Sequence, residues 1–204
     1  PFNLLTIPTP DNLDLKTTNA NTIKVALLLD TSNSMDGLIE QAKSQLWKIV
    51  GELSNVQKGE TSPTLEIALY DYGNDNNSIT KGYVRQLTPF TSDMDLVSEK
   101  LFGLTTQGGN EYCGQVIHTS LTDLDWGINE KDLQLIYIAG NEPFNQGNMP
   151  FEKACGMAKQ KGIMINTIFC GRRAEGLESG SFKGANMTGG EFMNIDQDKA
   201  TVYV

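Results

Sequence analysis

The sequence lacks a cysteine framework for disulfides or zinc, and it lacks a hydrophobic segment long enough to cross a membrane. Its 204 residues include three cysteines, Cys113, Cys155 and Cys170, and none is spaced as a metal-binding pair. The longest apolar run, residues 25–29, is far shorter than the roughly 20 residues needed to span a bilayer. We therefore expect a globular domain with its own core, free buried thiols, and no direct membrane insertion by this segment.

An excess of positive charge is also missing. The chain has 25 Asp and Glu against 16 Lys and Arg, a formal net charge of -9. Nucleic acids and anionic membranes require a basic face, so neither is expected as a partner. An acidic surface is compatible with cation binding, although ordinary solvation of surface carboxylates explains the charge without any site.

Sequence signatures of common enzymes are absent. His118 is the only histidine, and it falls in a predicted helix beside apolar residues, which favours a structural or solvent-facing role. No serine at a strand-to-helix elbow pairs with it to suggest a catalytic triad. The Gly-x-x-x-x-Gly-Lys signature of a phosphate-binding loop does not occur. We expect a protein that is not an enzyme.

Apolar strand patterns alternate with amphipathic helix patterns along the chain. Strands are predicted at residues 23–29, 65–71, 83–87, 133–138, 163–169 and 191–195. Helices are predicted at residues 36–56, 93–101, 113–124 and 150–161, followed by a weakly helical, glycine-broken stretch at 172–187. This alternation predicts an α/β fold: a doubly wound, mainly parallel central sheet with helices on both faces.

The domain organisation follows from the same patterns. Residues 1–22 are rich in Pro, Thr, Asn and Asp without periodicity, and we interpret them as an N-terminal linker. Residues 23–204 are expected to form a single domain. The start of the chain has neither a signal-peptide pattern nor a methionine, so we expect that a targeting segment has been removed.

Three polar loops follow or connect these elements at residues 30–34, 105–111 and 139–142. In a parallel sheet such loops meet at the carboxyl edge, where ligands bind. Asp30, Ser32 and Ser34 alternate after a buried strand, so their oxygens can converge. A carboxylate with two hydroxyls is a hard donor set suited to Mg²⁺, Mn²⁺ or Ca²⁺. The alternative is that this loop only caps the following helix.

The strand, the Asp30-x-Ser32-x-Ser34 motif and the long helix after it resemble the von Willebrand factor type A family. Three later segments agree with that family in order and spacing: residues 104–117, 135–143 and 188–192. The resemblance implies a doubly wound sheet with a metal-ion-dependent adhesion site. At such a site the bound ion completes its coordination with an acidic residue of a partner protein.

The second and third loops depart from the family pattern. Glu111 occupies the place where the family has a threonine after two glycines, and Thr105 and Thr106, which precede the glycines, are the fallbacks. In the third loop the family has an aspartate after the strand, whereas this chain has Gly140 and Asn141. By resemblance, the metal site is therefore Asp30, Ser32, Ser34, Glu111 and Asn141, with Glu142 as the runner-up to Asn141.

The expected function is a divalent-metal-dependent protein-binding module, with Mg²⁺ first and Mn²⁺ or Ca²⁺ possible. Its partner would be a protein or peptide that presents a carboxylate, contacted by Asn33, Tyr112 and Glu142 around the ion. The alternative is a metal-free scaffold domain of a larger cell-envelope protein. By resemblance, an extracytoplasmic location, in the periplasm or cell envelope, is expected.

Two further groups of residues allow other interpretations. Tyr70 and Tyr72, with Tyr112, have the aromatic character of a recognition surface. Asp71 and Asp75, with Glu66, carry charge for a second cation site, although a solvated loop is the simpler interpretation.

Overall fold

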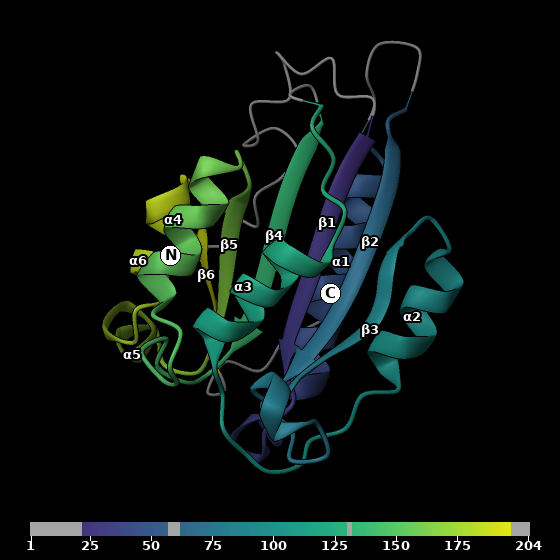
Figure 1. The fold of residues 1–204 in the computed structure, drawn as a ribbon. Helices are drawn as coiled ribbons and strands as arrows, with labels where there is room; N and C mark the ends of the chain where they lie inside the picture. The colour runs from purple at the N-terminus through teal and green to yellow at the C-terminus, as the bar shows by residue number, and fades with distance from the viewer. Residues whose placement is uncertain (1–21, 57–61, 130–131, 197–204) are drawn as a thin grey trace, which may run out of the picture.

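The protein forms a six-stranded sheet enclosed by helices, described by a computed structural model for residues 22–56, 62–129 and 132–196 (Figure 1). The strand order is β3-β2-β1-β4-β5-β6. All neighbouring strands are parallel except β2 and β3, which are antiparallel. The strands are β1 (Thr22–Asp30), β2 (Thr64–Tyr72), β3 (Val84–Thr91), β4 (Leu133–Gly140), β5 (Met164–Cys170) and β6 (Phe192–Ile195). The predicted α/β class and the mainly parallel sheet are confirmed.

The strand order reverses between β1 and β4. From β1 the chain proceeds to β2 and β3 on one side, and from β4 it proceeds to β5 and β6 on the other. The two strands pair in parallel, with Leu29 opposite Ala139, so both end at the same edge of the sheet. In doubly wound folds this reversal leaves a crevice outside the strand ends, and the loops after Asp30 and Gly140 border it.

Helices cover both faces of the sheet, because successive side chains of its buried central strands point to opposite sides. Leu27 packs with Leu46 into the core beneath α1 and α2, whereas Leu28 packs with Val116 and Ala154 beneath α3 and α4. Figure 1 shows α1 on the far face and α3 on the near face. The helices are α1 (Ile39–Ser54), α2 (Met94–Phe102), α3 (Cys113–Asp123), α4 (Phe151–Gln160), α5 (Arg173–Glu178) and α6 (Ser181–Thr188).

The start of α1 departs from the predicted elements at the candidate site. The apolar pattern predicts a helix from residue 36, but a short 3-10 helix (Asn33–Met35) comes first and α1 begins at Ile39. Gly37 lies between them with φ +81°, a left-handed conformation that a right-handed helix cannot contain. This break keeps residues 30–34 outside the α-helix, where their side chains can turn toward one point.

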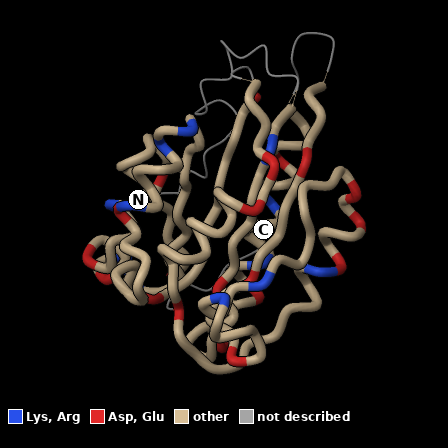
Figure 2. The backbone as a smooth tube through the Cα atoms, viewed as in Figure 1, with Lys and Arg blue, Asp and Glu red and all other residues tan. Residues whose placement is uncertain are grey.

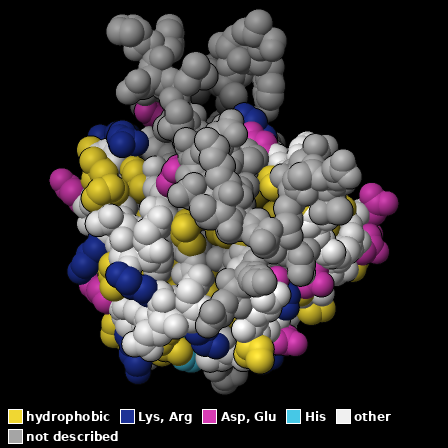
Figure 3. Space-filling view, turned by 90° about the horizontal axis from the view of Figure 1, so that it is seen from above, with side chains coloured by type: hydrophobic (Ala, Val, Ile, Leu, Met, Phe, Trp, Pro, Cys, Tyr) yellow, Lys and Arg dark blue, Asp and Glu magenta, His cyan; other side chains and the backbone are white. Residues whose placement is uncertain are grey.

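Charged residues are interspersed over the described surface. In the view of Figure 2, positions of Lys and Arg and positions of Asp and Glu are both scattered over the backbone. The view from above in Figure 3, onto the end where the strands begin, likewise shows charged side chains of both signs around the rim. None of the described helices is long and apolar enough to cross a bilayer. The predicted linker lies outside the described residues, except for Thr22, which begins β1.

Candidate metal-binding site

Asp30 is the centre of the candidate site. It is the last residue of β1, and its side chain is completely buried. One carboxylate oxygen, Oδ1, accepts a hydrogen bond of 2.8 Å from the Ser32 amide, while Oδ2 is buried without a hydrogen-bond partner. Burial raises the pKa of Asp30 from 3.8 to about 7; hydrogen bonding to Ser32 opposes this, and the charges of Glu111 and Glu142 add to it.

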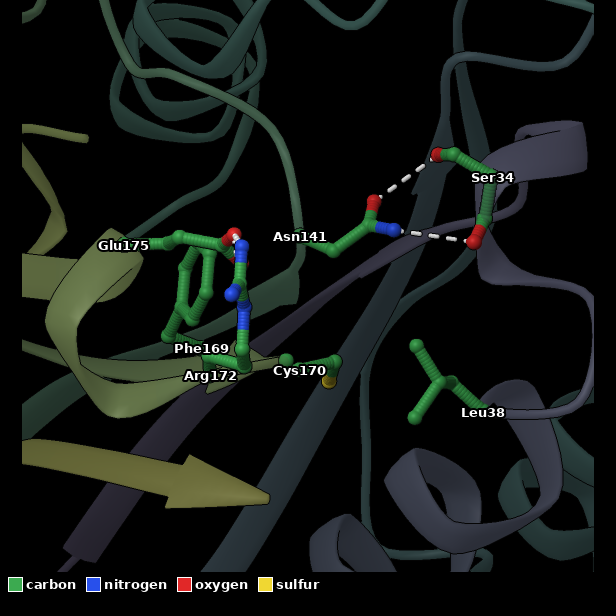
Figure 4. A pocket seen from close by; sticks show the side chains of 8 residues that line it. Ser34, Leu38, Asn141, Phe169, Cys170, Arg172 and Glu175 are labelled. Atoms are coloured by element: carbon green, nitrogen blue, oxygen red, sulfur yellow. Dashed lines mark hydrogen bonds and ion pairs between the residues drawn. The ribbon is translucent and has the colours of Figure 1, made fainter. Parts of the chain in front are cut away.

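Three neutral oxygens line up beside this carboxylate. Ser32 Oγ lies 2.8 Å from Ser34 Oγ, which in turn donates to Asn141 Oδ1 at 2.8 Å. Asn141 Nδ2 also donates to the backbone oxygen of Ser34 at 2.8 Å, as the dashed lines in Figure 4 show. The two hydrogen bonds fix the amide orientation and join the loop after β1 to the loop after β4. The structure thus brings Asn141 to the motif, as predicted.

Glu111 approaches the same place from the second loop. A Cβ on Gly73 would lie 3.0 Å from Asp30 Oδ1 and 3.1 Å from Glu111 Cγ, so both side chains border the same glycine. Glu111 is buried, and burial is the main cause of its raised pKa, with Glu142 and Asp75 contributing repulsion. Two carboxylates with raised pKa values and little solvent are therefore held close together, an arrangement that a cation would stabilise.

The turn after β2 was not predicted to belong to the site. A Cβ on Gly109 would lie 1.9 Å from the Gly73 oxygen, and one on Gly108 would lie 2.1 Å from Asp75 Cγ. The Asp75 amide also donates to the Gln107 oxygen at 3.1 Å. The glycine pair is therefore needed for the second loop to pack against this turn. Glycines mark both the turn after β2 and the second loop in the sequence. Nothing in the sequence, however, indicates that these two segments lie in contact.

The structure explains why the third loop begins with glycine. A Cβ on Gly140 would lie 2.6 Å from Tyr72 Oη and 3.0 Å from both Cβ and Oδ2 of Asp30. A side chain at position 140 would have to displace the carboxylate that forms the centre of the site. The polar side chain of this loop is consequently supplied one residue later, by Asn141.

The predicted partner-contacting residues surround the site. Asn33 is exposed, and its Oδ1 accepts a hydrogen bond of 3.1 Å from the Gly108 amide. Tyr112 is half-buried, with its ring edge-on to Tyr83 at 5.9 Å. Glu142 accepts a hydrogen bond of 3.1 Å from Gln146. These contacts hold the side chains near the site, and their roles toward a partner remain predictions.

Two interpretations of residues in β2 are wrong. Tyr70 and Tyr72 are completely buried in the core and cannot line a recognition surface. Asp71 is also completely buried and pairs with Arg85, so it belongs neither to a solvated loop nor to a second cation site.

The donor set fits a hard divalent cation. Among the described residues there is no cluster of three or more His, Cys, Asp or Glu able to hold a metal, so any site here depends on hydroxyl and amide oxygens. Neighbouring ligands of octahedral Mg²⁺ are about 3 Å apart, close to the 2.8 Å spacings of Ser32, Ser34 and Asn141 oxygens. The unpartnered Asp30 Oδ2 supplies the negative charge such a cation requires.

A pocket of about 460 Å³ adjoins the site. It begins at Ser34 and Asn141 and continues along the end of β5 to Cys170 and Arg172 (Figure 4). Arg172 forms an ion pair with Glu175 at its far side. A ligand held at the candidate metal site would therefore have space for a neighbouring group.

Comparison with known proteins gives a structural likeness only. No family model matches the sequence, and no curated protein matches it significantly. Among solved structures, the SpRpn10 VWA domain superposes with a TM-score of 0.63 at 15% identity, covering 85% of this chain and 88% of that chain. The conserved hypothetical protein BatB from Bacteroides thetaiotaomicron gives 0.61 at 18% identity, covering 85% and 90%.

Longer proteins contain the same fold. Proximal thread matrix protein 1 from the mussel byssus, described with a zinc-occupied MIDAS motif, gives a TM-score of 0.66 at 14% identity. That match covers 89% of this chain and 43% of the mussel chain. The fold of this chain is therefore that of von Willebrand factor type A domains, as the sequence motif predicted.

The close contacts of Gly140 generate a prediction about stability. Gly140→Ala should lower the free energy of unfolding by about 1–3 kcal/mol, because the new methyl group overpacks the space beside Tyr72 and Asp30. Gly156→Ala is the matched control, since a Cβ there meets nothing within 4 Å and alanine favours α4 by about 0.5–1 kcal/mol. Urea unfolding measures both; equal effects would contradict the close approach.

The buried carboxylate predicts a pH dependence in metal-free protein. Because the pKa of Asp30 is about 7 in the folded protein and 3.8 for an unperturbed aspartate, the folded state binds the proton more tightly. Stability should therefore fall as pH rises from about 4 to 7 and level off above, each unit of pKa difference being worth about 1.4 kcal/mol. Asp30→Asn should remove this contribution. Parallel stability curves for the two proteins in EDTA would refute the assignment.

Proposed function

We propose that this domain, which has the fold of a von Willebrand factor type A domain, binds a divalent cation through Asp30, Ser32 and Ser34. Glu111 and Asn141 assist, directly or through waters. The observation that carries the proposal is the buried Asp30 carboxylate, whose Oδ2 has no partner beside a row of neutral oxygens. Burial of an unpaired charge is costly, and a cation at this edge of the sheet offsets that cost.

Mg²⁺ is the first choice of ion, with Mn²⁺ and Ca²⁺ as alternatives. All the proposed donors are oxygens, and hard cations prefer oxygen over nitrogen or sulfur. Two carboxylates, Asp30 and Glu111, give the site a charge of about -2 when both are ionised. Mg²⁺ ordinarily retains several waters at such sites. The MIDAS motif described with zinc in the mussel protein supports a divalent ion at this position of the fold.

The partner in this proposal is a protein or peptide that presents a carboxylate. When bound, the ion would act as a Lewis acid and would be coordinated by an oxygen of that carboxylate. Glu111 and Glu142 add negative potential at the site, so an acidic ligand is repelled without the ion and recognised with it. Asn33, Tyr112 and Glu142 then contact the residues on either side. The name of another protein with this fold, the pilus adhesin SpaC from Lactobacillus rhamnosus GG, is consistent with such a role.

An extracytoplasmic location is part of the same proposal. Matched structures include SpaC and an aerotolerance-related membrane protein from Bacteroides fragilis, and these names support the assignment. The chain covers only 28% of SpaC, so the activity of that whole adhesin is not transferred to this domain.

The proposed cation predicts a metal-dependent gain in stability. EDTA-stripped protein should show a saturable rise in Tm with Mg²⁺ or Mn²⁺, equivalent to about 2.7 kcal/mol at one hundred times Kd. Asp30→Ala should abolish the rise, and Asp95→Asn, at an exposed position of α2 outside the proposed site, should keep it. No rise with Mg²⁺, Mn²⁺ or Ca²⁺ would leave a metal-free scaffold domain as the better account.

The proposed ligand chemistry predicts ion-dependent peptide capture. Immobilised domain in Mn²⁺ should enrich peptides containing Asp or Glu from a displayed library, and EDTA should release them. Replacing the critical peptide Asp by Asn should lower capture at least tenfold, since the ion-bound carboxylate is lost. Enrichment that is the same in EDTA, or that ignores the acidic residue, would show that the partner does not bind through the ion.

A further inference from the structure

We propose that the ion pair of buried Asp71 with half-exposed Arg85 positions the cation site by holding Thr31, the residue between Asp30 and Ser32. This inference rests on the proposed cation binding and assigns residues that the sequence motif does not contain. Asp71 lies in β2 and Arg85 in the edge strand β3, so the pair reaches the site from the side of the sheet opposite Asn141.

Asp71 is a completely buried carboxylate with donors on both oxygens. Arg85 Nε donates to Oδ1 at 3.0 Å and Arg85 Nη2 donates to Oδ2 at 2.7 Å. Asn77 Nδ2 adds a hydrogen bond to Oδ1 at 3.3 Å. Such a two-pronged contact fixes the carboxylate in orientation as well as in charge. Asp71 is thus a rigid acceptor at the end of β2.

Thr31 is the point where this rigid group meets the metal loop. Its hydroxyl lies 3.3 Å from both Asp71 Oδ2 and the Tyr72 backbone oxygen, which are its acceptors. Its amide donates to the Tyr72 oxygen at 2.9 Å, and its own oxygen accepts from the Gln107 amide at 2.9 Å. The residue is completely buried. Its position therefore determines where its two neighbours, Asp30 and Ser32, place their oxygens.

The Asp71 carboxylate is also linked to the rim of the site, formed by Tyr83 and Tyr112. Asn77 Nδ2 donates to Asp71 Oδ1 and to the Tyr83 oxygen, the latter at 3.2 Å. Tyr83 is the one non-glycine residue with positive φ, +59°, in the described part of the chain, and its ring packs against Tyr112. A backbone held in this uncommon conformation requires firm support from its surroundings. Asp71 thus links the metal loop to the rim that we assign to partner contact.

A positioning role explains why an ion pair lies next to Thr31 in the metal loop. Asp71 is completely buried, whereas the Arg85 side chain is 48% exposed, so the pair does not simply fill space in the core. In metal sites, residues that orient the ligands typically change metal affinity 10–100-fold when they are lost. The Asp71 and Arg85 pair is placed to have this effect through Thr31.

The test compares Thr31→Val with Thr31→Ser in Mn²⁺ titrations of EDTA-stripped protein. Valine keeps the shape but removes the hydroxyl, whereas serine retains it. We expect Thr31→Val to weaken Mn²⁺ binding about tenfold and Thr31→Ser to retain the wild-type affinity. The metal-free Tm of each variant is measured alongside. A role in folding only would lower this Tm and leave the Mn²⁺ affinity unchanged.

A double variant, Asp71→Asn with Arg85→Met, tests the pair itself if Thr31→Val does not fold. It removes the buried charge and its partner together, and we expect the same tenfold loss of Mn²⁺ affinity. If the wild-type protein binds Mn²⁺ and the variant binds it with equal affinity, the positioning role is wrong but the cation site stands. Wild-type protein that binds no Mn²⁺ overturns the cation site, and with it this inference.

Discussion

The burial of one carboxylate organises the carboxyl edge of this sheet. Asp30 ends the central strand β1 with no solvent exposure and with one oxygen, Oδ2, left without a partner. Gly73 and Gly140 lack side chains where a Cβ would approach this carboxylate to 3.0 Å. Ser32 turns its amide toward Oδ1. These features leave space around the carboxylate, and only one of its two oxygens, Oδ1, has a hydrogen-bond partner. In the proposed function a cation, and then the acidic residue of a partner, complete the arrangement.

Two supports on opposite sides keep that carboxylate in place. On the β4 side, Asn141 is hydrogen-bonded twice to Ser34, which closes the first loop against the third. On the β2 side, Asp71 faces Thr31 and so holds the first loop from beneath. The site thus lies where the strand order reverses, with a support from each half of the sheet. Metal affinity in this account depends on residues outside the Asp-x-Ser-x-Ser motif as much as on the motif itself.

The sequence predicted the fold because its signals are local. Unbroken apolar runs mark buried parallel strands, and the helices between them show a clear 3.6-residue period, so every predicted strand has a counterpart in the sheet. The convergence of Asp30, Ser32 and Asn141 was predictable for the same reason, since each follows a strand that ends at one edge. What the sequence did not reveal depends on contacts between distant segments. Asp71 ends a predicted strand, and nothing in the sequence pairs it with Arg85, which lies beside it only in the fold. The left-handed Gly37 likewise delays the start of α1 without disturbing the apolar period.

Anomalous diffraction from crystals grown with Mn²⁺ after EDTA treatment tests the central claim most directly, because it locates the ion without reference to stability or partner. If the cation binds as proposed, these crystals should show one strong anomalous peak at the carboxyl edge, within coordination distance of oxygens from Asp30, Ser32 and Ser34 and close to Glu111 and Asn141. The same crystals of Asp30→Ala should show no peak there. If wild-type crystals show no peak there, or show a peak only elsewhere on the molecule, the proposed cation site is wrong. Asp30 would then be a buried carboxylate with a structural role only.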